Sequence, residues 1–571
     1  MLESTDAHDD YSDAVSVGPY AYSFKAFRAA DLDVVRRDTT TGAETRLVLL
    51  ADYTVAGVGN EDGGTITLKS ALATGHVLTI RRSQARRQQT DLGDSGRSAA
   101  SRTIFTRSAM ESSARGLRGG LSVVASVSAC RDNTAGADPK DYGCALDGST
   151  DDSAAFQACI DANKGKRILV RNGTLLCAGI TLSDSTYDDT GIVCDGGELK
   201  LKANAGASNF DGSIWAGLVI TGASRVSLTL AWDGNRENQG TTREGVHCVV
   251  LAGADRTHIH SLTGRETAGD LLYIDKRSPL NPAIAPNSTN IVVDFLQARN
   301  SADAGRNACS VISCDGLTIG TLHSYQVGGI INGLQEPGGL DLEPNWPGQS
   351  ITDVVIGEVD VVTAGSTGFA VQGVATTSDA TRDWNIRRVT AHNVKVRCTS
   401  LGRPKITRVR DMGGNISNTV VGKRGQGAFV DAIDHCTLTL ATRNTATSVY
   451  LGYSDFVNDS WITVDCQDYN VAGVVAIGIN RSVVRGRVHG AVAGSTAIAI
   501  QTQSNGRALT QTEVKYEVDA PYDGHNGRAF YNVPGDTIIY GAGTYARNCD
   551  WSGYANEGSR ITGTIPRFNV K

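Results

Sequence analysis

Long apolar runs, an excess of positive charge and closely paired cysteines are all missing from these 571 residues. No stretch of about 18 apolar residues is present to span a bilayer. The net charge of −6 provides no positive field for a nucleic-acid backbone. We therefore expect neither membrane insertion nor a nucleic-acid partner. The acidic N-terminus lacks a charged segment followed by an apolar one, so we expect no secretory signal and synthesis in a cytoplasm.

Methionine, proline and aromatic residues are scarce, whereas glycine is abundant at 65 residues. This composition favours an all-β chain of short strands and tight turns over long helices. The twelve cysteines show no CxxC pair and no zinc-type spacing, so we expect most to be buried free thiols. Cys309 and Cys314 are near enough in sequence to pair across a turn, but a reducing compartment disfavours that disulfide.

Four segments follow one another along the chain. Alternating short runs separated by TTTG, GNEDGG and ATG turns predict a small antiparallel β-domain within residues 1–95. Residues 96–140 are rich in Arg, Ser and Ala and are typical of a polar neck. Residues 141–520 are repetitive. Residues 521–571 contain more Tyr and Trp, and we expect a β-rich cap or trimerisation segment there.

Apolar runs of three to five residues, each followed by Gly, Asn or Asp, recur through the repetitive segment. The run at Val249 precedes the run at Tyr273 by 24 residues, and Leu451, Ile477 and Ile500 are spaced by 26 and 23. This is the period of a β-solenoid coil, and it is too short for a βαβ unit. A β-sandwich is disfavoured because one rhythm persists without a domain break.

Three motifs resemble known families. The segment DYTVAGVGNEDGGTITLKSALATGHVLTIRR is similar to the N-terminal adaptor of phage tail fibres and tailspikes. The opening DGSTDDSAAFQACIDA, followed by RILVRNGTLL, resembles that of pectate-lyase-like right-handed β-helices. Further on, CSVISCDGLTIG and GGLDLEPN resemble another segment of the same fold. Two departures are Asn172 where a proline is common and SRTIFTRSAMESSARG where an acidic helix is usual.

The resemblance implies a homotrimeric right-handed parallel β-helix. Its N-terminal domain would attach to a phage baseplate or tail component. On the virion it would bind and depolymerise a bacterial surface polysaccharide, either O-antigen or capsule.

The DLEPN motif places two acids on one face of a strand. If Leu340 and Leu342 fill the interior, Asp341 and Glu343 point outward, and Asn345 follows at the end of the strand. We expect carboxylates on this strand, or two coils apart, to be roughly 7–10 Å from one another, near the separation that inverting glycosidases use. Our first assignment makes Glu343 the acid and Asp341 the base.

Neighbouring coils supply further candidates on the same face. The same alternation places Leu272 and Ile274 inside and puts Tyr273, Asp275, His247 and Val249 outside. We assign catalysis to Asp341, Glu343, Asp270 and Asp275, and substrate binding to Tyr273, His247, Arg306, Asn307 and Asn345.

Structural explanations compete with these assignments. Acids and Asn at β-helix turns often bond the backbone of the next coil, and Arg306 is more simply explained by a salt bridge. His258 and His260 share a strand face, but without a third ligand we predict no metal site and no cofactor.

Three functions stay open at this point. The first is endo-glycosidic hydrolysis. The second is β-elimination on an acidic glycan, with Lys276, Arg277 or Arg306 neutralising its carboxylate. The third is a receptor-binding spike without turnover.

Overall fold

A computed structural model of the protein describes residues 8–82 and 136–568, apart from internal gaps, the longest of which are 204–214, 277–285, 375–383, 503–511 and 548–559. The chain divides into two compact units, Met1–Gly119 and Gly120–Lys571. Almost all of the predicted neck at 96–140 lies outside the described residues. Among the described residues, no helix is long and apolar enough to cross a membrane.

The first unit is a small antiparallel β-domain, as predicted. Its two sheets have the orders β1-β7-β3-β4 and β2-β6-β5. Their strands are β1 (His8–Ser12), β2 (Tyr20–Tyr22), β3 (Leu32–Asp38), β4 (Glu44–Arg46), β5 (Tyr53–Ala56), β6 (Gly64–Leu68) and β7 (His76–Arg82). Alternation of buried and exposed residues along these strands supplies a separate core that includes Tyr22, Ile66 and Leu78.

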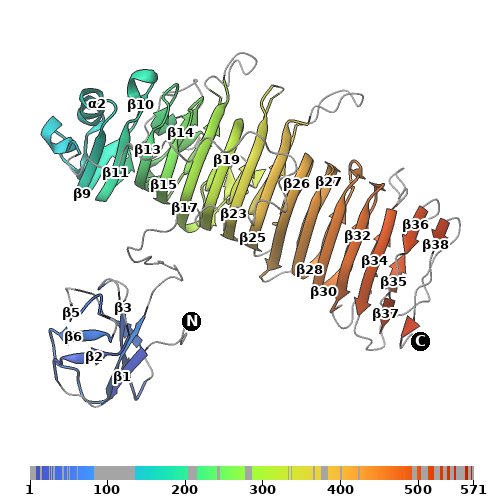
Figure 1. Ribbon diagram of the computed structural model, residues 1–571, viewed down its shortest axis with the longest axis horizontal. Coiled ribbons are helices and arrows are strands. Elements are labelled where there is room, and N and C mark those ends of the chain that lie inside the picture. Colours follow the sequence, from blue (N-terminus) through green and yellow to red (C-terminus); the bar gives the residue numbers. More distant parts are fainter. Residues whose placement is uncertain are drawn as a thin grey trace, which may run out of the picture. The chain divides into compact units, whose positions relative to one another are not determined.

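The second unit opens with a capping helix. After η3 (Pro139–Tyr142) and β8 (Asp147–Asp151), α2 (Ser153–Ala162) buries Phe156, Cys159 and Ile160 against the first coil (Figure 1). Asp152 precedes the helix, but its carboxylate accepts hydrogen bonds from the backbone N–H groups of Ala145 and Leu146 at 2.7 and 3.0 Å. The acidic turn that the sequence singled out therefore anchors the incoming chain as well as starting the helix.

Successive coils then stack into one long parallel sheet structure, which Figure 1 shows as a row of tilted strands. Two main ladders of paired strands run along the first coils, and we call them the short-strand face and the long-strand face. The short-strand face begins with β10 (Ile180–Leu182), β12 (Trp215–Ile220), β14 (Val246–Ala252), β16 (Leu272–Asp275), β18 (Cys309–Val311), β22 (Leu340–Leu342) and β24 (Phe369–Gln372).

The long-strand face runs beside it. It begins with β9 (Arg167–Cys177), β11 (Gly191–Leu201), β13 (Ser227–Asp233), β15 (His258–Arg265), β17 (Ser288–Ala304), β19 (Cys314–Val327), β23 (Ile351–Thr363) and β25 (Ile386–Cys398). The connections between the faces hold η4 (Ser185–Tyr187), η5 (Arg236–Asn238) and the small hairpin of β20 (Ile330–Ile331) and β21 (Leu334–Gln335).

Later strands are long enough to contribute to both faces. These strands are β26 (Lys405–Val420), β28 (Thr437–Leu451) and β30 (Trp461–Ala476). Shorter partners between them are β27 (Gln426–Asp434), β29 (Val457–Asn458), β31 (Ile479–Asn480) and β32 (Val483–His489). Parallel pairing continues through β33 (Ile498–Thr502), β34 (Thr512–Asp519), β35 (Arg528–Tyr531), β36 (Thr537–Tyr540), β37 (Tyr545–Arg547), β38 (Arg560–Thr562) and β39 (Arg567–Phe568).

The predicted parallel β-helix is thus confirmed. One apolar core runs from Cys144 to Val488 along its interior. Hydrogen-bonded side chains in neighbouring coils lie 22 to 37 residues apart in the chain. The ten cysteines within the described residues are free thiols, nine of them buried, and Cys309 and Cys314 form no disulfide.

A regular corner explains why each apolar run ends in a small or polar residue. One residue per coil adopts a positive φ there, including Arg225, Asp353 and Arg388. Oppositely charged side chains at these corners pair between coils, as in Arg388 Nε with Asp353 Oδ1 at 2.6 Å. Such exposed pairs contribute little individually, so the continuous core provides most of the stability.

Candidate functional site

The predicted acids do face away from the interior core. Leu340 and Leu342 belong to that core, and Asp341 lies between them on the opposite side of β22. In the register of the short-strand face Asp341 neighbours Ser310, and Ser310 neighbours Tyr273. The sequence alternation therefore correctly collects Tyr273, Asp275, Asp341 and Glu343 on one outer surface.

That surface is buried, which the sequence did not predict. Asp341 is 1% exposed, and Asp270, Asp275 and Asn307 are 0% exposed. Tyr273 joins a second apolar cluster with Val219, Val250 and Ile312 on the outer side of the sheet. Strand alternation specifies a face, but it does not specify whether other parts of the chain cover that face.

The rings of His247 and Tyr273 stack on each other. Their centroids lie 4.5 Å apart at an interplanar angle of 13°. His247 Nδ1 accepts a hydrogen bond from the Asp270 backbone N–H at 3.0 Å, so the proton of the neutral imidazole lies on Nε2. Tyr273, which the sequence assigned to substrate binding, is therefore buried with its ring stacked on His247.

The expected alternation of inward and outward side chains fails at Val249 on β14. Cys248 and Val249 both belong to the interior core, so Val249 points inward and the prediction that it points outward is wrong. The next residue, Val250, takes the outer position beside Tyr273.

Asp270 is held by two of the five residues predicted to bind substrate. Arg306 Nη1 donates to Asp270 Oδ2 at 2.8 Å, and the Asn307 backbone N–H donates to Oδ1 at 2.9 Å. The Asn307 side chain donates to Ser310 Oγ and accepts from the Gly338 backbone N–H. Asn307, which the sequence assigned to substrate binding, is fully buried, whereas Arg306 keeps 11% of its side chain exposed.

Asp275 connects two loops. Its Oδ1 accepts from the Lys276 backbone N–H at 2.7 Å and from Gln349 Nε2 at 3.1 Å. Gln349 Oε1 in turn accepts from the backbone N–H groups of Asn345 and Trp346. These contacts give Asp275 a positioning function, and they fix the turn that follows the DLEPN motif.

Asp341 differs from the other buried acids. Its Oδ1 has no hydrogen-bond partner among the described residues. Burial raises the pKa of Asp341 well above its ordinary value, the neighbouring Glu343 carboxylate raises it further, and Arg306 opposes the rise. Glu343 therefore lies close enough for its charge to act on Asp341, and the separation of roughly 7–10 Å expected between carboxylates stays a prediction.

Two groups of binding candidates were missed. Trp346 is 59% exposed and directly follows Asn345, which is also exposed, so the tryptophan next to the DLEPN motif was a signal in the sequence. Further along the same face, the Arg403 guanidinium lies 4.5 Å from the Phe429 ring and 5.9 Å from the Tyr450 ring. We call Arg403, Phe429, Tyr450 and Tyr453 the aromatic patch; no sequence motif marks it.

Comparison with known proteins connects part of this chain to a phage protein. No family model matches it. Over 98 residues, 17% of its length, the chain is 36% identical to the tail spike protein of Salmonella phage epsilon15. A segment of this parallel β-helix chain is therefore similar to a phage tail spike protein. The match covers only 9% of the Salmonella phage protein.

Solved structures that match parts of this chain include enzymes and an adhesin. The A-module of the mannuronan C-5 epimerase AlgE6 of Azotobacter vinelandii matches with a TM-score of 0.31 and 13% identity, over 76% of this chain and 97% of that module. An iota-carrageenase matches with a TM-score of 0.35 and 11% identity, over 69% of this chain and 91% of the enzyme. PfbA, a surface adhesin of Streptococcus pneumoniae, matches with a TM-score of 0.41 and 10% identity, over 70% and 93%. Likenesses this weak transfer none of these activities to the chain.

Proposed function

We propose that this protein is a phage tailspike that binds a bacterial surface polysaccharide. It hydrolyses internal glycosidic bonds of the polysaccharide, with Asp341 and Glu343 as the catalytic carboxyls. The observation that carries the proposal is the environment of Asp341. This carboxyl is buried and raised in pKa, and one oxygen has no hydrogen-bond partner among the described residues. A structural acid normally has its oxygens satisfied, whereas a proton donor must keep its proton near neutral pH.

The two carboxyls have opposite roles in this proposal. Asp341 holds the proton and delivers it to the glycosidic oxygen, because burial favours its neutral form. Glu343 is only partly buried, and it acts as the base toward water. This reverses the assignment made from the sequence. The burial of Asp341, which the sequence does not reveal, supports this choice of acid and base.

The attacking water needs a place beside Glu343. An inverting mechanism places a water beside the base and needs about 6.5–9.5 Å between the carboxyl groups. We propose that the sugar enters between Asp341 and Glu343. Trp346 and Asn345 form the exposed margin at which a sugar ring first contacts the site.

The assembly belongs to the proposal as well. The tailspike-like segment and the separate antiparallel N-terminal unit support attachment to a phage tail component, homotrimeric assembly and a location on the virion. The C-terminal residues 521–571 remain our candidate for a trimerisation segment.

A specific observation favours one alternative. Lys276 is 6% exposed, and burial lowers the pKa of its amine, with Asp275 opposing that change. An amine with a lowered pKa can act as the base of a β-elimination, and Arg306 would neutralise an acidic sugar. The chain would then be a polysaccharide lyase.

One experiment separates these functions. Purified O-antigen and capsular polysaccharides are incubated with the full-length protein, followed by chain sizing, reducing-end assay and ultraviolet absorbance. Hydrolysis shortens a bound glycan and releases reducing ends without new absorbance. New ultraviolet absorbance from unsaturated sugars would establish the lyase instead. Binding without shortening would leave a receptor-binding spike and remove the enzymatic proposal.

A further inference from the structure

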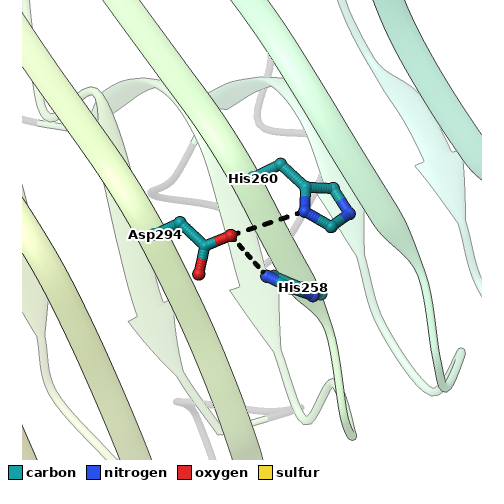
Figure 2. Close-up of side chains that lie close together, drawn as sticks. All are labelled: His258, His260 and Asp294. Carbon is teal, nitrogen blue, oxygen red and sulfur yellow. Dashed lines mark hydrogen bonds and ion pairs between the residues drawn. The ribbon is translucent and has the colours of Figure 1, made fainter. Parts of the chain in front are cut away.

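Two histidines and an aspartate meet on the long-strand face, away from the acids considered above. His258 and His260 lie on β15, and Asp294 lies on the neighbouring strand β17 (Figure 2). Asp294 Oδ2 is 2.8 Å from His258 Nε2 and 3.5 Å from His260 Nδ1. The imidazole ring centroids are 3.8 Å apart. The three ligand atoms all lie within 4.8 Å of one another.

The register of the coils explains why these residues meet. Alternation puts His258 and His260 on the outer side of β15, because Ile259 between them is fully buried in the core. Ile259 pairs with Val293, so Asp294 comes level with His260 in the next coil. The third ligand that the sequence lacked therefore lies 34 to 36 residues further along the chain, where only the coil register reveals it.

The two ring nitrogens of His260 have separate polar neighbours. His260 Nε2 lies 3.1 Å from Ser227 Oγ, and Nδ1 lies on the side of Asp294. Neutral imidazole is the form that binds metals.

We propose that His258, His260 and Asp294 bind a divalent transition metal of the Zn²⁺ type. Two imidazoles and one carboxylate match the ligand preferences of such ions, and three protein ligands leave coordination positions open. Such an ion would form bonds of about 2.0–2.2 Å to each ligand. The bound ion would join the coils of β15 and β17 and remain accessible from outside.

A second group of similar residues provides an internal control. Asp434, His435 and Asp459 also lie within 4.8 Å of one another. Their carboxylates already have cationic partners, since Arg481 forms two hydrogen bonds with Asp459 and Arg410 Nε lies 3.5 Å from Asp434 Oδ2. In the described part of the chain, the charged and titratable partners of the Asp294 carboxylate are His258 and His260, with no Lys or Arg beside it. We therefore expect the first group, and not the second, to bind the metal.

A nearby positive charge limits the affinity of the site for a metal ion. Arg167 acts on His260, although less than the other groups around it, and its charge disfavours a cation there. The three ligands are also partly exposed to water, with 21% of His258, 41% of His260 and 53% of Asp294 accessible. Their exposure means that substitution should leave the core intact.

Calorimetric titration of the full-length protein with ZnCl₂ at pH 7.5 tests the site, with visible absorption of Co²⁺ as a second readout of coordination. We compare the wild type with His258→Ala, Asp294→Asn and the control His435→Ala. We expect the wild type to bind Zn²⁺ saturably. Binding should weaken at least tenfold in His258→Ala and Asp294→Asn and should be unchanged in His435→Ala. At pH 5, binding should be lost as the imidazoles become protonated.

Either of two results would overturn the proposal. One is the absence of saturable Zn²⁺ binding by the wild type. The other is equal binding by wild type, His258→Ala and Asp294→Asn. Unchanged circular dichroism of each variant shows that any loss of binding is not a loss of fold. Polysaccharide cleavage does not enter this test, so its outcome is independent of the proposed enzymatic function.

Discussion

Asp341 and Asp431 are both buried acids on the short-strand face, yet their surroundings differ. Asp341 is 1% and Asp431 4% exposed, and burial raises the pKa of each. Asp431 Oδ1 accepts backbone hydrogen bonds from Ser454 and Asp455 at 3.0 and 2.9 Å, and these contacts lower its pKa in turn. Asp341 has Glu343 beside it and an oxygen without a partner among the described residues. Burial alone therefore does not distinguish the two acids, whereas the oxygen without a partner among the described residues does.

The largest expected effect comes from removing the proton donor. Asp341→Asn should lower the rate of polysaccharide cleavage by about 10²–10⁴-fold, the usual contribution of a general acid. Asp431→Asn, the matched variant, should stay within a few-fold of the wild type because Asp431 holds a turn. Rates of reducing-end release measure both. Equal losses in the two variants would remove the distinction between these acids.

Breaking the ion pair beneath the site comes next. Arg306→Ala leaves Asp270, which is fully buried, without its 2.8 Å partner. Loss of one partner of a buried pair costs about 3–5 kcal/mol, so we expect a clear fall in the free energy of unfolding. Arg388→Ala breaks an exposed pair with Asp353 and should cost about 1 kcal/mol or less. Chemical denaturation of both variants checks this, and similar losses would contradict the contrast.

The pKa of Asp341 also predicts a pH dependence of stability. The folded state holds this proton more tightly than the unfolded chain, whose Asp pKa is about 3.9. Stability should therefore fall as pH rises above about 4, by at most about 1.4 kcal/mol per pH unit, until the folded pKa is reached. The fall should be smaller in Asp341→Asn. Denaturation midpoints between pH 4 and 8 measure the difference, and identical slopes would count against the raised pKa.

The smallest effect concerns binding at the aromatic patch. Tyr453 is 46% exposed, and its ring lies 6.1 Å from Phe429 and 6.3 Å from Tyr450. Loss of one stacking surface costs about 1 kcal/mol, so Tyr453→Ala should weaken polysaccharide binding several-fold and leave the cleavage rate at saturation unchanged. Tyr142→Ala removes an exposed tyrosine near the capping helix and serves as the control. Unaltered affinity in Tyr453→Ala would exclude the patch from the binding surface.

The sequence predicted the fold better than the site. Repeating apolar runs and their turns specify coils, because a parallel β-helix buries the same positions in every coil. Alternation also placed Asp341 and Tyr273 on one face. It did not show that this face is covered, that Asn307 is buried, or that Cys248 and Val249 both point inward. Pairing of Asp294 with His258 depends on coil register, which a single sequence does not fix.

The central claim is that Asp341 carries a proton at neutral pH. Infrared difference spectroscopy of wild type against Asp341→Asn at pH 7 tests it directly, because a protonated carboxyl and a carboxylate absorb at distinct frequencies. We predict that the substitution removes a protonated-carboxyl band and that this band persists in wild type well above pH 4. Loss of a carboxylate band instead would show that Asp341 is ionised and would contradict its role as the acid.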